Sequence, residues 1–268
     1  MTNAKQFPTY EVYAVRYATI ERRAKDTFLT WREEDRPQDL DFFIWVIRGN
    51  SKTYVVDTGF SRISSDKRGR PFINHPTIAL EHLGITASEV TDVIMTHLHY
   101  DHAGNTDQFP NAIFHLQEAE IAFATGKSMA YPMFREHYAL DDVLRMVSYA
   151  HAGRVKFYDG DGIIDEGITV HRMDGHTIGL QSVAVNTERG TVVIASDALH
   201  YFANLEHQNP FPVVINVAAE LEGYQRLQNL ASSKDHLVPS HDPEVLARYP
   251  HAKGSVDIAC LHLPPNTK

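Results

Sequence analysis

Apolar and aromatic residues dominate three early segments of the chain, a pattern that predicts β-strands. The segments are Glu11–Ile20, Asp41–Ile47 and Thr53–Val56, and the last two are predicted to form a hairpin that turns at Gly49-Asn50. Pro76–Leu83 has the composition of a short helix and Asp92–Thr96 that of a buried strand. This strand-helix-strand order predicts a crossover connection.

A second set of strands follows two further helices. Between the predicted helices Gln117–Ala124 and Asp141–Ala150 lies the aromatic and Met-rich stretch Met129–Tyr138, a candidate lid. Turns are expected at Asp174-Gly175 and Arg189-Gly190. The remaining predicted elements are the strands Ile168–Met173, Gln181–Asn186, Thr191–Ala195 and His236–Val238 and the helix Ala218–Leu230. With no linker or low-complexity tract in the sequence, residues 1–268 are expected to form one domain of two sheets covered by helices.

Charge and composition narrow the class of protein. The 268 residues include 25 basic and 34 acidic side chains, a formal charge of -9 that disfavours nucleic acid as a partner. No apolar run is long enough for a signal peptide or a membrane span, so a cytoplasmic location is expected. The single cysteine, Cys260, is interpreted as a buried small residue. The 16 histidines are unusually many for this length.

Four metal-ligand side chains lie within six residues of one another, directly after the strand predicted at Asp92–Thr96. They are His97, His99, Asp101 and His102. In a continuing strand His102 would point away from the other three, so a loop is expected to gather them. Four ligands are too many for one catalytic ion that keeps an open position, which predicts further ligands downstream.

Three downstream residues lie where such ligands are expected. His176, Asp197 and His241 each come just after a predicted strand, so one edge of the sheets is expected to collect them. Imidazole and carboxylate ligands without thiolate favour zinc, with iron or manganese as substitutes.

The motif Thr96-His-Leu-His-Tyr-Asp-His102, followed by the three downstream residues, resembles the metallo-β-lactamase superfamily. The turn Val55-Val-Asp-Thr-Gly59 matches a further motif of that superfamily, and the resemblance runs from about residue 10 to 250. It implies an α/β fold, an αββα sandwich of two mixed sheets flanked by helices, with two metal ions at one edge. The implied ligands are His97, His99 and His176 for the first ion, Asp101, His102 and His241 for the second, and Asp197 as the bridge.

Within the superfamily the chain is most similar to the N-acyl-homoserine lactonase and 4-pyridoxolactonase group. That resemblance implies a quorum-quenching type of lactonase, which opens a cyclic ester. The group carries a Tyr three residues after the bridging Asp, whereas this chain has His200 there and Tyr201 next. Asp101, His200 and Tyr201 are therefore the candidate catalytic residues, and His200, favoured on register, would add a pH dependence near 6.5. The expected partner is a small-molecule lactone or ester, with a homodimer left open.

Three other enzyme classes share parts of this pattern. A glyoxalase II-like thioesterase has the same histidine motif but a closer spacing than His102 to His176. A mononuclear iron dioxygenase would use His97, His176 and Asp197 on one iron. Flavodiiron proteins normally have Glu where this chain has His99. A binding module that keeps its metals without turnover is the non-enzymatic alternative.

Other polar and aromatic residues have a structural and a functional interpretation. Asp57 either orients a ligand histidine or shapes the turn before Gly59. An aromatic and Met cluster is more often packing than a substrate pocket; its members are Met129, Tyr131, Met133, Phe134 and Tyr138. The histidines outside the motif are expected to be structural; they are His75, His82, His115, His137, His151, His171, His207, His236, His251 and His262.

Overall fold

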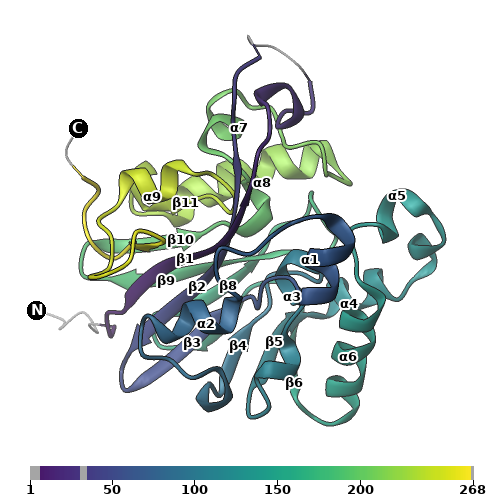
Figure 1. Ribbon diagram of the computed structural model, residues 1–268, viewed down its shortest axis with the longest axis horizontal. Coiled ribbons are helices and arrows are strands. Elements are labelled where there is room, and N and C mark those ends of the chain that lie inside the picture. Colours follow the sequence, from purple (N-terminus) through teal and green to yellow (C-terminus); the bar gives the residue numbers. More distant parts are fainter. Residues whose placement is uncertain (1–6, 31–34, 267–268) are drawn as a thin grey trace, which may run out of the picture.

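Two β-sheets face each other in the computed structural model, which describes residues 7–30 and 35–266 (Figure 1). The first sheet has the order β12-β1-β2-β3-β4-β5-β6, antiparallel from β12 to β3 and parallel from β3 to β6. Its strands are β1 (Glu11–Ile20), β2 (Leu40–Gly49), β3 (Lys52–Val56), β4 (Asp92–Ile94), β5 (Ile113–Gln117), β6 (Val155–Tyr158) and β12 (Ile258–Cys260).

The second sheet has the order β11-β10-β9-β8-β7 and is also mixed, because β10 and β11 are parallel while the other pairs are antiparallel. Its strands are β7 (Gly162–Asp165), β8 (Ile168–Arg172), β9 (Gln181–Thr187), β10 (Gly190–Ile194) and β11 (Leu237–Val238).

Helices cover the outer face of each sheet, with α2, α4 and α6 along the first sheet and α8 along the second (Figure 1). This confirms the expected αββα sandwich. The α-helices are α1 (Arg62–Arg68), α2 (Pro76–Glu81), α3 (Tyr100–Ala103), α4 (Glu118–Ala124), α5 (Pro132–Arg135), α6 (Leu140–His151), α7 (Phe202–Glu206), α8 (Val217–Leu230) and α9 (Glu244–Arg248). Short 3-10 helices are η1 (Ala24–Asp26), η2 (Ala87–Glu89), η3 (Thr106–Gln108), η4 (Lys127–Ala130), η5 (Ser196–Ala198) and η6 (Lys234–His236).

The central strands are apolar on both faces because both faces are covered. In β1, Val12 and Ala14 pack between the two sheets, whereas Val15 and Tyr17 face the helices. Trp45 of β2 is fully buried between the sheets. Such two-sided burial explains why these strands appear in the sequence as continuous apolar runs.

Several predicted boundaries were wrong in detail. The β2–β3 hairpin turns at Asn50-Ser51 rather than Gly49-Asn50, because Gly49 pairs with Lys52 and both turn residues have positive φ. Strand β4 ends at Ile94, two residues before the predicted Thr96. The elements that the pattern missed are short: β5, β6, β7 and β12, and α1, α3, α5, α7 and α9.

The strand-terminal position of the histidine motif was predicted, but its conformation was not. The expected loop is instead a short extended segment followed by α3, which begins after His99 and carries Asp101 and His102. This one-turn helix rotates its side chains back toward His97, which an extended chain cannot do. No helix of the described residues is long and apolar enough to cross a membrane.

Candidate metal centre

All seven predicted ligands come to one end of the sandwich. His97 and His99 follow β4, and α3 adds Asp101 and His102. The remaining three lie after strands of the second sheet: His176 between β8 and β9, Asp197 in η5 after β10, and His241 after β11. Because β10 and β11 are parallel neighbours, their carboxyl ends place the last two ligands side by side.

The two carboxylate oxygens of Asp197 face two different sets of imidazoles. Its Oδ2 lies 3.3 Å from Nε2 of His176 and 3.8 Å from Nε2 of His97. Its Oδ1 lies 3.3 Å from Nε2 of His102 and 3.2 Å from Nε2 of His241. One carboxylate thus joins two half-sites.

The remaining two ligands complete these half-sites. His99 Nδ1 lies 2.9 Å from His176 Nε2, and Asp101 Oδ2 lies 4.0 Å from His241 Nε2. Among the described residues, candidate ligand atoms within 4.8 Å of one another form three groups, of which the third is Asp197, His200 and His241 and the other two reproduce the expected sets. The first is His97, His99, His176 and Asp197, and the second is Asp101, His102 and His241.

The donor atoms fit metal ions. Buried polar atoms normally have a hydrogen-bond partner. Nevertheless, Nε2 of His97, Nε2 of His102 and Oδ1 of Asp197 are buried and have none within residues 7–30 and 35–266. These orphaned atoms point at one another, as expected of ligands whose partner is a cation.

Four of the imidazoles are held through their other ring nitrogen, Nδ1. The Nδ1 of His102 lies 2.7 Å from Asp57 Oδ2. That of His176 lies 2.7 Å from the Val213 carbonyl and that of His241 2.7 Å from the Asp41 carbonyl. His97 Nδ1 lies 3.1 Å from the Thr96 hydroxyl. An N–H donated from Nδ1 leaves Nε2 deprotonated and free to bind metal, the usual arrangement of ligating histidines.

Asp57 therefore holds the ring of His102, a predicted ligand, as one of its two predicted interpretations requires. It also accepts hydrogen bonds from the Thr96 amide and hydroxyl, both at 2.7 Å, and the Ser196 hydroxyl donates to that of Thr96. Asp57 and Ser196 both have left-handed backbones, with φ of 60° and 51°. Such conformations are costly outside glycine, so this buried network holds the two ligand-bearing turns in place.

A second buried carboxylate, that of Glu120 in α4, fixes the other ligand loops. It accepts hydrogen bonds from the Leu98 amide, the Thr177 hydroxyl and the Tyr138 hydroxyl. Leu98 lies between His97 and His99, and Thr177 follows His176, so one side chain ties together the two segments of the first half-site. Only glycine fits at 179, because a Cβ there would lie 2.1 Å from the Glu120 amide nitrogen.

The charge states suit a cation site. Burial, reinforced by the neighbouring imidazoles, lowers the pKa of His97 and His99 well below the usual value. The neutral imidazole favoured there is the metal-binding form. Burial also opposes charge on His102, yet the carboxylates of Asp197, Asp57 and Asp101 raise its pKa well above 6.5. The same negative field attracts a metal ion.

Of the two candidates after Asp197, His200 faces the metal centre. Its Nε2 lies 3.3 Å from Asp197 Oδ2, and its ring stacks on Phe211 at 4.1 Å between centroids. Burial lowers the pKa of His200, which moves the expected pH dependence below 6.5. The Tyr201 hydroxyl instead donates to the Asp39 carbonyl at 3.2 Å, and Tyr201 is absent from the described residues that line the cavities beside the centre.

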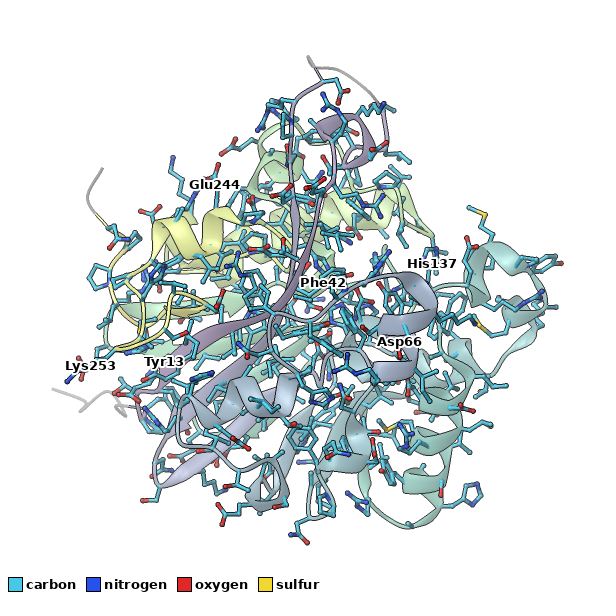
Figure 2. All side chains as sticks on the ribbon, in the orientation of Figure 1. Tyr13, Phe42, Asp66, His137, Glu244 and Lys253 are labelled. Atoms are coloured by element: carbon cyan, nitrogen blue, oxygen red, sulfur yellow. The ribbon has the colours of Figure 1, made fainter. Side chains whose placement is uncertain are left out.

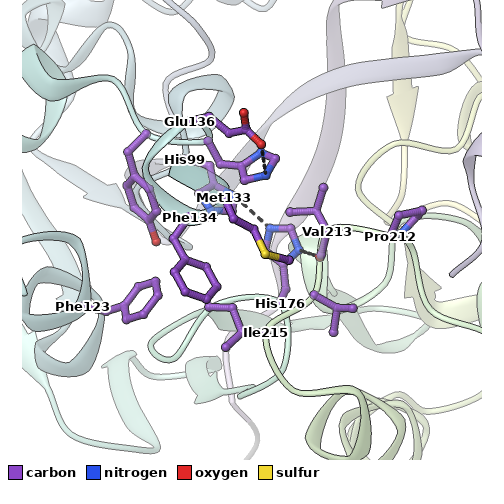
Figure 3. A pocket seen from close by; sticks show the side chains of 12 residues that line it. His99, Phe123, Met133, Phe134, Glu136, His176, Pro212, Val213 and Ile215 are labelled. Atoms are coloured by element: carbon purple, nitrogen blue, oxygen red, sulfur yellow. Dashed lines mark hydrogen bonds and ion pairs between the residues drawn. The ribbon is translucent and has the colours of Figure 1, made fainter. Parts of the chain in front are cut away.

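Two cavities adjoin the metal centre and share His99, Glu136, His137, His176 and Val213. The first, the apolar cavity, is lined further by Phe123, Met133, Phe134, Tyr138 and Ile215 (Figure 3). The second, the arginine cavity, is lined further by Arg22, Arg68, Arg70, Phe42, Tyr100, Asp101, Asp197, His200, Phe211 and His241. Phe42 and His137 are labelled in Figure 2.

Some residues of the aromatic and Met-rich stretch Met129–Tyr138 line a cavity, and others only pack against the protein or face solvent. Met133, Phe134 and Tyr138 line the apolar cavity, whereas Met129 packs against the core and Tyr131 is exposed. Part of the stretch forms η4 and α5 beside the site.

His137 and the three arginines were missed by the sequence analysis. His137 lies in both cavity linings because the Tyr100 amide donates to its carbonyl, which ties it to the metal motif. No spacing rule links these residues to the motif, so the sequence offered no signal for them. Other histidines make structural hydrogen bonds as expected, among them His75, His115, His171, His236, His251 and His262.

Known proteins resemble the chain in sequence and in fold. A protein of Mycobacterium tuberculosis described as a probable metallo-hydrolase is 28% identical over 238 residues, covering 78% of this chain and 70% of the relative. An N-acyl homoserine lactonase of a Bacillus species is 30% identical over 188 residues, covering 65% and 70%. The solved structure of a quorum-quenching N-acyl homoserine lactone lactonase superposes with a TM-score of 0.74 at 21% identity, covering 90% of this chain and 95% of that chain.

A family profile covers most of the sandwich. Residues 43–241 match the metallo-beta-lactamase superfamily, a range that begins in β2 and ends at the last histidine of the second half-site. With the αββα fold and the seven clustered candidate ligands, the match establishes that this chain belongs to the metallo-beta-lactamase superfamily of metal-dependent hydrolases.

Proposed function

We propose that this chain is a dinuclear metal-dependent hydrolase that opens the ring of a lactone. The observation that carries the dinuclear part is the division of the Asp197 carboxylate, whose oxygens face separate pairs of imidazoles. A mononuclear iron dioxygenase needs only the first half-site and leaves Asp101, His102 and His241 without a role.

Two zinc ions are the proposed cofactors. His97, His99 and His176 would hold the first ion, Asp101, His102 and His241 the second, and Asp197 both. When bound, such a pair lowers the pKa of a water molecule toward roughly 7 and polarises a carbonyl group.

The protein's own residues supply orientation and proton transfer. We assign His200 to the leaving oxygen, because its ring is fixed by Phe211 and its Nδ1 is buried without a partner among the described residues. A neutral imidazole can still donate one N–H to the oxygen as the ring opens. Asp101 lines the same cavity and is proposed to accept a proton from the attacking water, in addition to its role as a ligand.

A lactone is proposed as the substrate because lactonases are among the relatives in sequence and fold. An alkoxide leaving group suits a site that offers a cation and a hydrogen-bond donor on one side of the carbonyl. N-acyl-homoserine lactones are one candidate class, and the apolar cavity offers Phe123, Phe134 and Ile215 to an acyl chain.

Elemental analysis and a lactone panel test this proposal together. The purified protein should carry close to two ions per chain, mainly zinc, and should release acid from intact lactones. One iron per chain with oxygen consumed during turnover would indicate the dioxygenase instead. Hydrolysis of thioesters in preference to every lactone would indicate the thioesterase.

A further inference from the structure

We propose that the substrate carries an anionic oxygen group, a carboxylate or a phosphate, which Arg22, Arg68 and Arg70 bind beside the metal centre. This inference rests on the proposed lactonase function and narrows its substrate to lactones that carry an anionic group, which uncharged N-acyl-homoserine lactones do not. Its basis is the placement of three guanidinium groups in the arginine cavity.

The three arginines come from two segments that converge at the site. Arg22 lies just after β1, Arg68 is the last residue of α1, and Arg70 follows it. All three line the cavity that contains Asp101, His200 and His241. They also line an open groove on the outside of the same region, together with Arg23 and the acidic residues Glu21, Asp26 and Asp39. The cluster therefore lies between the metal centre and solvent, where a substrate enters.

Several partly buried arginines have an acidic partner, whereas Arg22, Arg68 and Arg70 have none among the described residues. Arg16 pairs with Asp41 and Asp257, and Arg48 pairs with Glu11. By contrast, within residues 7–30 and 35–266 no carboxylate lies within 4.0 Å of the three guanidinium groups, and Arg22 Nε is buried with no hydrogen-bond partner. An arginine cannot shed its proton, so a partly buried, unpaired cluster favours an anion.

Aromatic rings hold two of the guanidinium groups in place. Arg68 lies 3.7 Å over the Tyr100 ring, and Arg70 lies 5.2 Å from the centroid of Tyr100 and 5.4 Å from that of Phe42. Stacking occupies the face of a guanidinium and leaves its N–H edge available. Arg68 uses part of its edge on the Glu136 carbonyl, while no hydrogen bond joins the Arg70 side chain to the described residues. Arg70 is therefore the principal anion ligand.

The charge balance of the cavity supports the same conclusion. Burial lowers the pKa of Arg70, and the positive charges of Arg22 and Arg68 add to that effect while Asp101 opposes it. Asp101 and Asp197 are committed to the metal ions, and the Glu136 side chain is 65% exposed. The remaining field is positive, in a protein whose formal charge is -9. An anionic oxygen group on the substrate would relieve the repulsion among the three guanidinium groups.

Matched lactones and variants test the proposal. The substrates are a five-membered lactone bearing a carboxylate, its phosphate counterpart, and its uncharged amide. In the zinc-loaded enzyme, Arg70→Met should lower the ratio of kcat/KM for the anionic lactones over the amide by about 10- to 100-fold, since a charged hydrogen-bond pair is lost. Arg70→Lys should recover part of that ratio, and raising the salt concentration should lower it in wild type.

Arg62→Met is the matched control, because Arg62 lies on α1 over Phe72 and is not among the described residues that line the cavity. It should leave the ratio unchanged. Arg68→Met is a second test if Arg70→Met fails to fold, as judged by its melting temperature and metal content. Calorimetric titration with glutarate and with inorganic phosphate gives a readout independent of turnover and distinguishes the two anions.

The outcomes separate this proposal from the lactonase proposal. Probe binding that requires Arg70 in an enzyme that opens no lactone would support the anion site and overturn the lactonase. Lactone turnover with a ratio and probe binding that are both insensitive to Arg70→Met and Arg68→Met would overturn the anion site and keep the lactonase.

Discussion

The two cavities that meet at the metal centre differ in how they are built. The apolar cavity is lined by Phe123, Met133, Phe134 and Ile215, which come from α4, α5 and the segment after α7. The arginine cavity is lined by Arg22, Phe42, Arg68 and Arg70 from the first 70 residues and by the rings of Tyr100 and Phe211. Both share His99 and His176, so neither is remote from the metal ions.

Affinity and specificity have different sources in the two cavities. Apolar contacts discriminate weakly between similar groups, whereas a site built for a charged group strongly rejects analogues that lack it. Under the proposals made above, the apolar side tolerates varied chains and the arginine side selects the substrate. Four variants act at different places: at the metal centre between the two cavities, in the arginine cavity, behind the candidate ligands, and in the apolar cavity.

The largest effect is expected at the junction. Asp197→Ala should weaken both ions together and abolish turnover of neutral and anionic lactones alike, because each of its oxygens serves a different half-site. Elemental analysis and turnover on both substrate types measure this. Two tightly bound ions with ordinary turnover in the variant would contradict the bridging role.

The next largest loss of activity is expected in the arginine cavity. His200→Ala should lower kcat by about 10² to 10⁴ with the metal content intact, because a donor to the leaving oxygen is removed. Tyr201→Phe is the matched control, since its hydroxyl contacts Asp39 and its loss should change kcat little. A loss in Tyr201→Phe with near-normal kcat in His200→Ala would reverse the assignment.

A smaller effect is expected behind the ligands, outside both cavities. Asp57→Asn should weaken metal affinity by about 10- to 100-fold, because a carboxylate partner of His102 is lost. Asn tolerates the left-handed backbone at this position, so the fold should survive. Competition with a zinc chelator measures the affinity, and exposed Asp66→Asn is the control. Equal zinc affinity in Asp57→Asn and wild type would rule out the orienting role.

The smallest effect is expected on the apolar side. Phe134→Ala should raise KM for a long-chain acyl lactone by about tenfold and for a short-chain one by less, because only the longer chain reaches the ring. Leu144→Ala, at a 55% exposed position of α6, is the control. KM values measured across chain lengths decide the point, and a uniform change at all lengths would place the chain elsewhere.

The sequence alone predicted the candidate ligands that the fold brings together and the order of the main elements. Apolar runs such as Glu11–Ile20 predicted buried strands, because a strand covered on both faces needs apolar side chains at every position. The apolar run before the histidine motif predicted that the motif lies at the end of a strand. These features are local, since the chemistry of a few consecutive residues specifies them.

Tertiary structure alone decided what surrounds the metal centre. Arg22 and Arg70 are 48 positions apart in numbering, and the pairing of the segment after α1 with β1, where Phe72 bridges Ala18, brings both to the cavity. Likewise, the register of the turn after β10 placed His200 toward Asp197 and buried Tyr201. Short elements such as α3 leave too few residues for a periodic pattern, so their conformation follows from the contacts that the rest of the fold imposes.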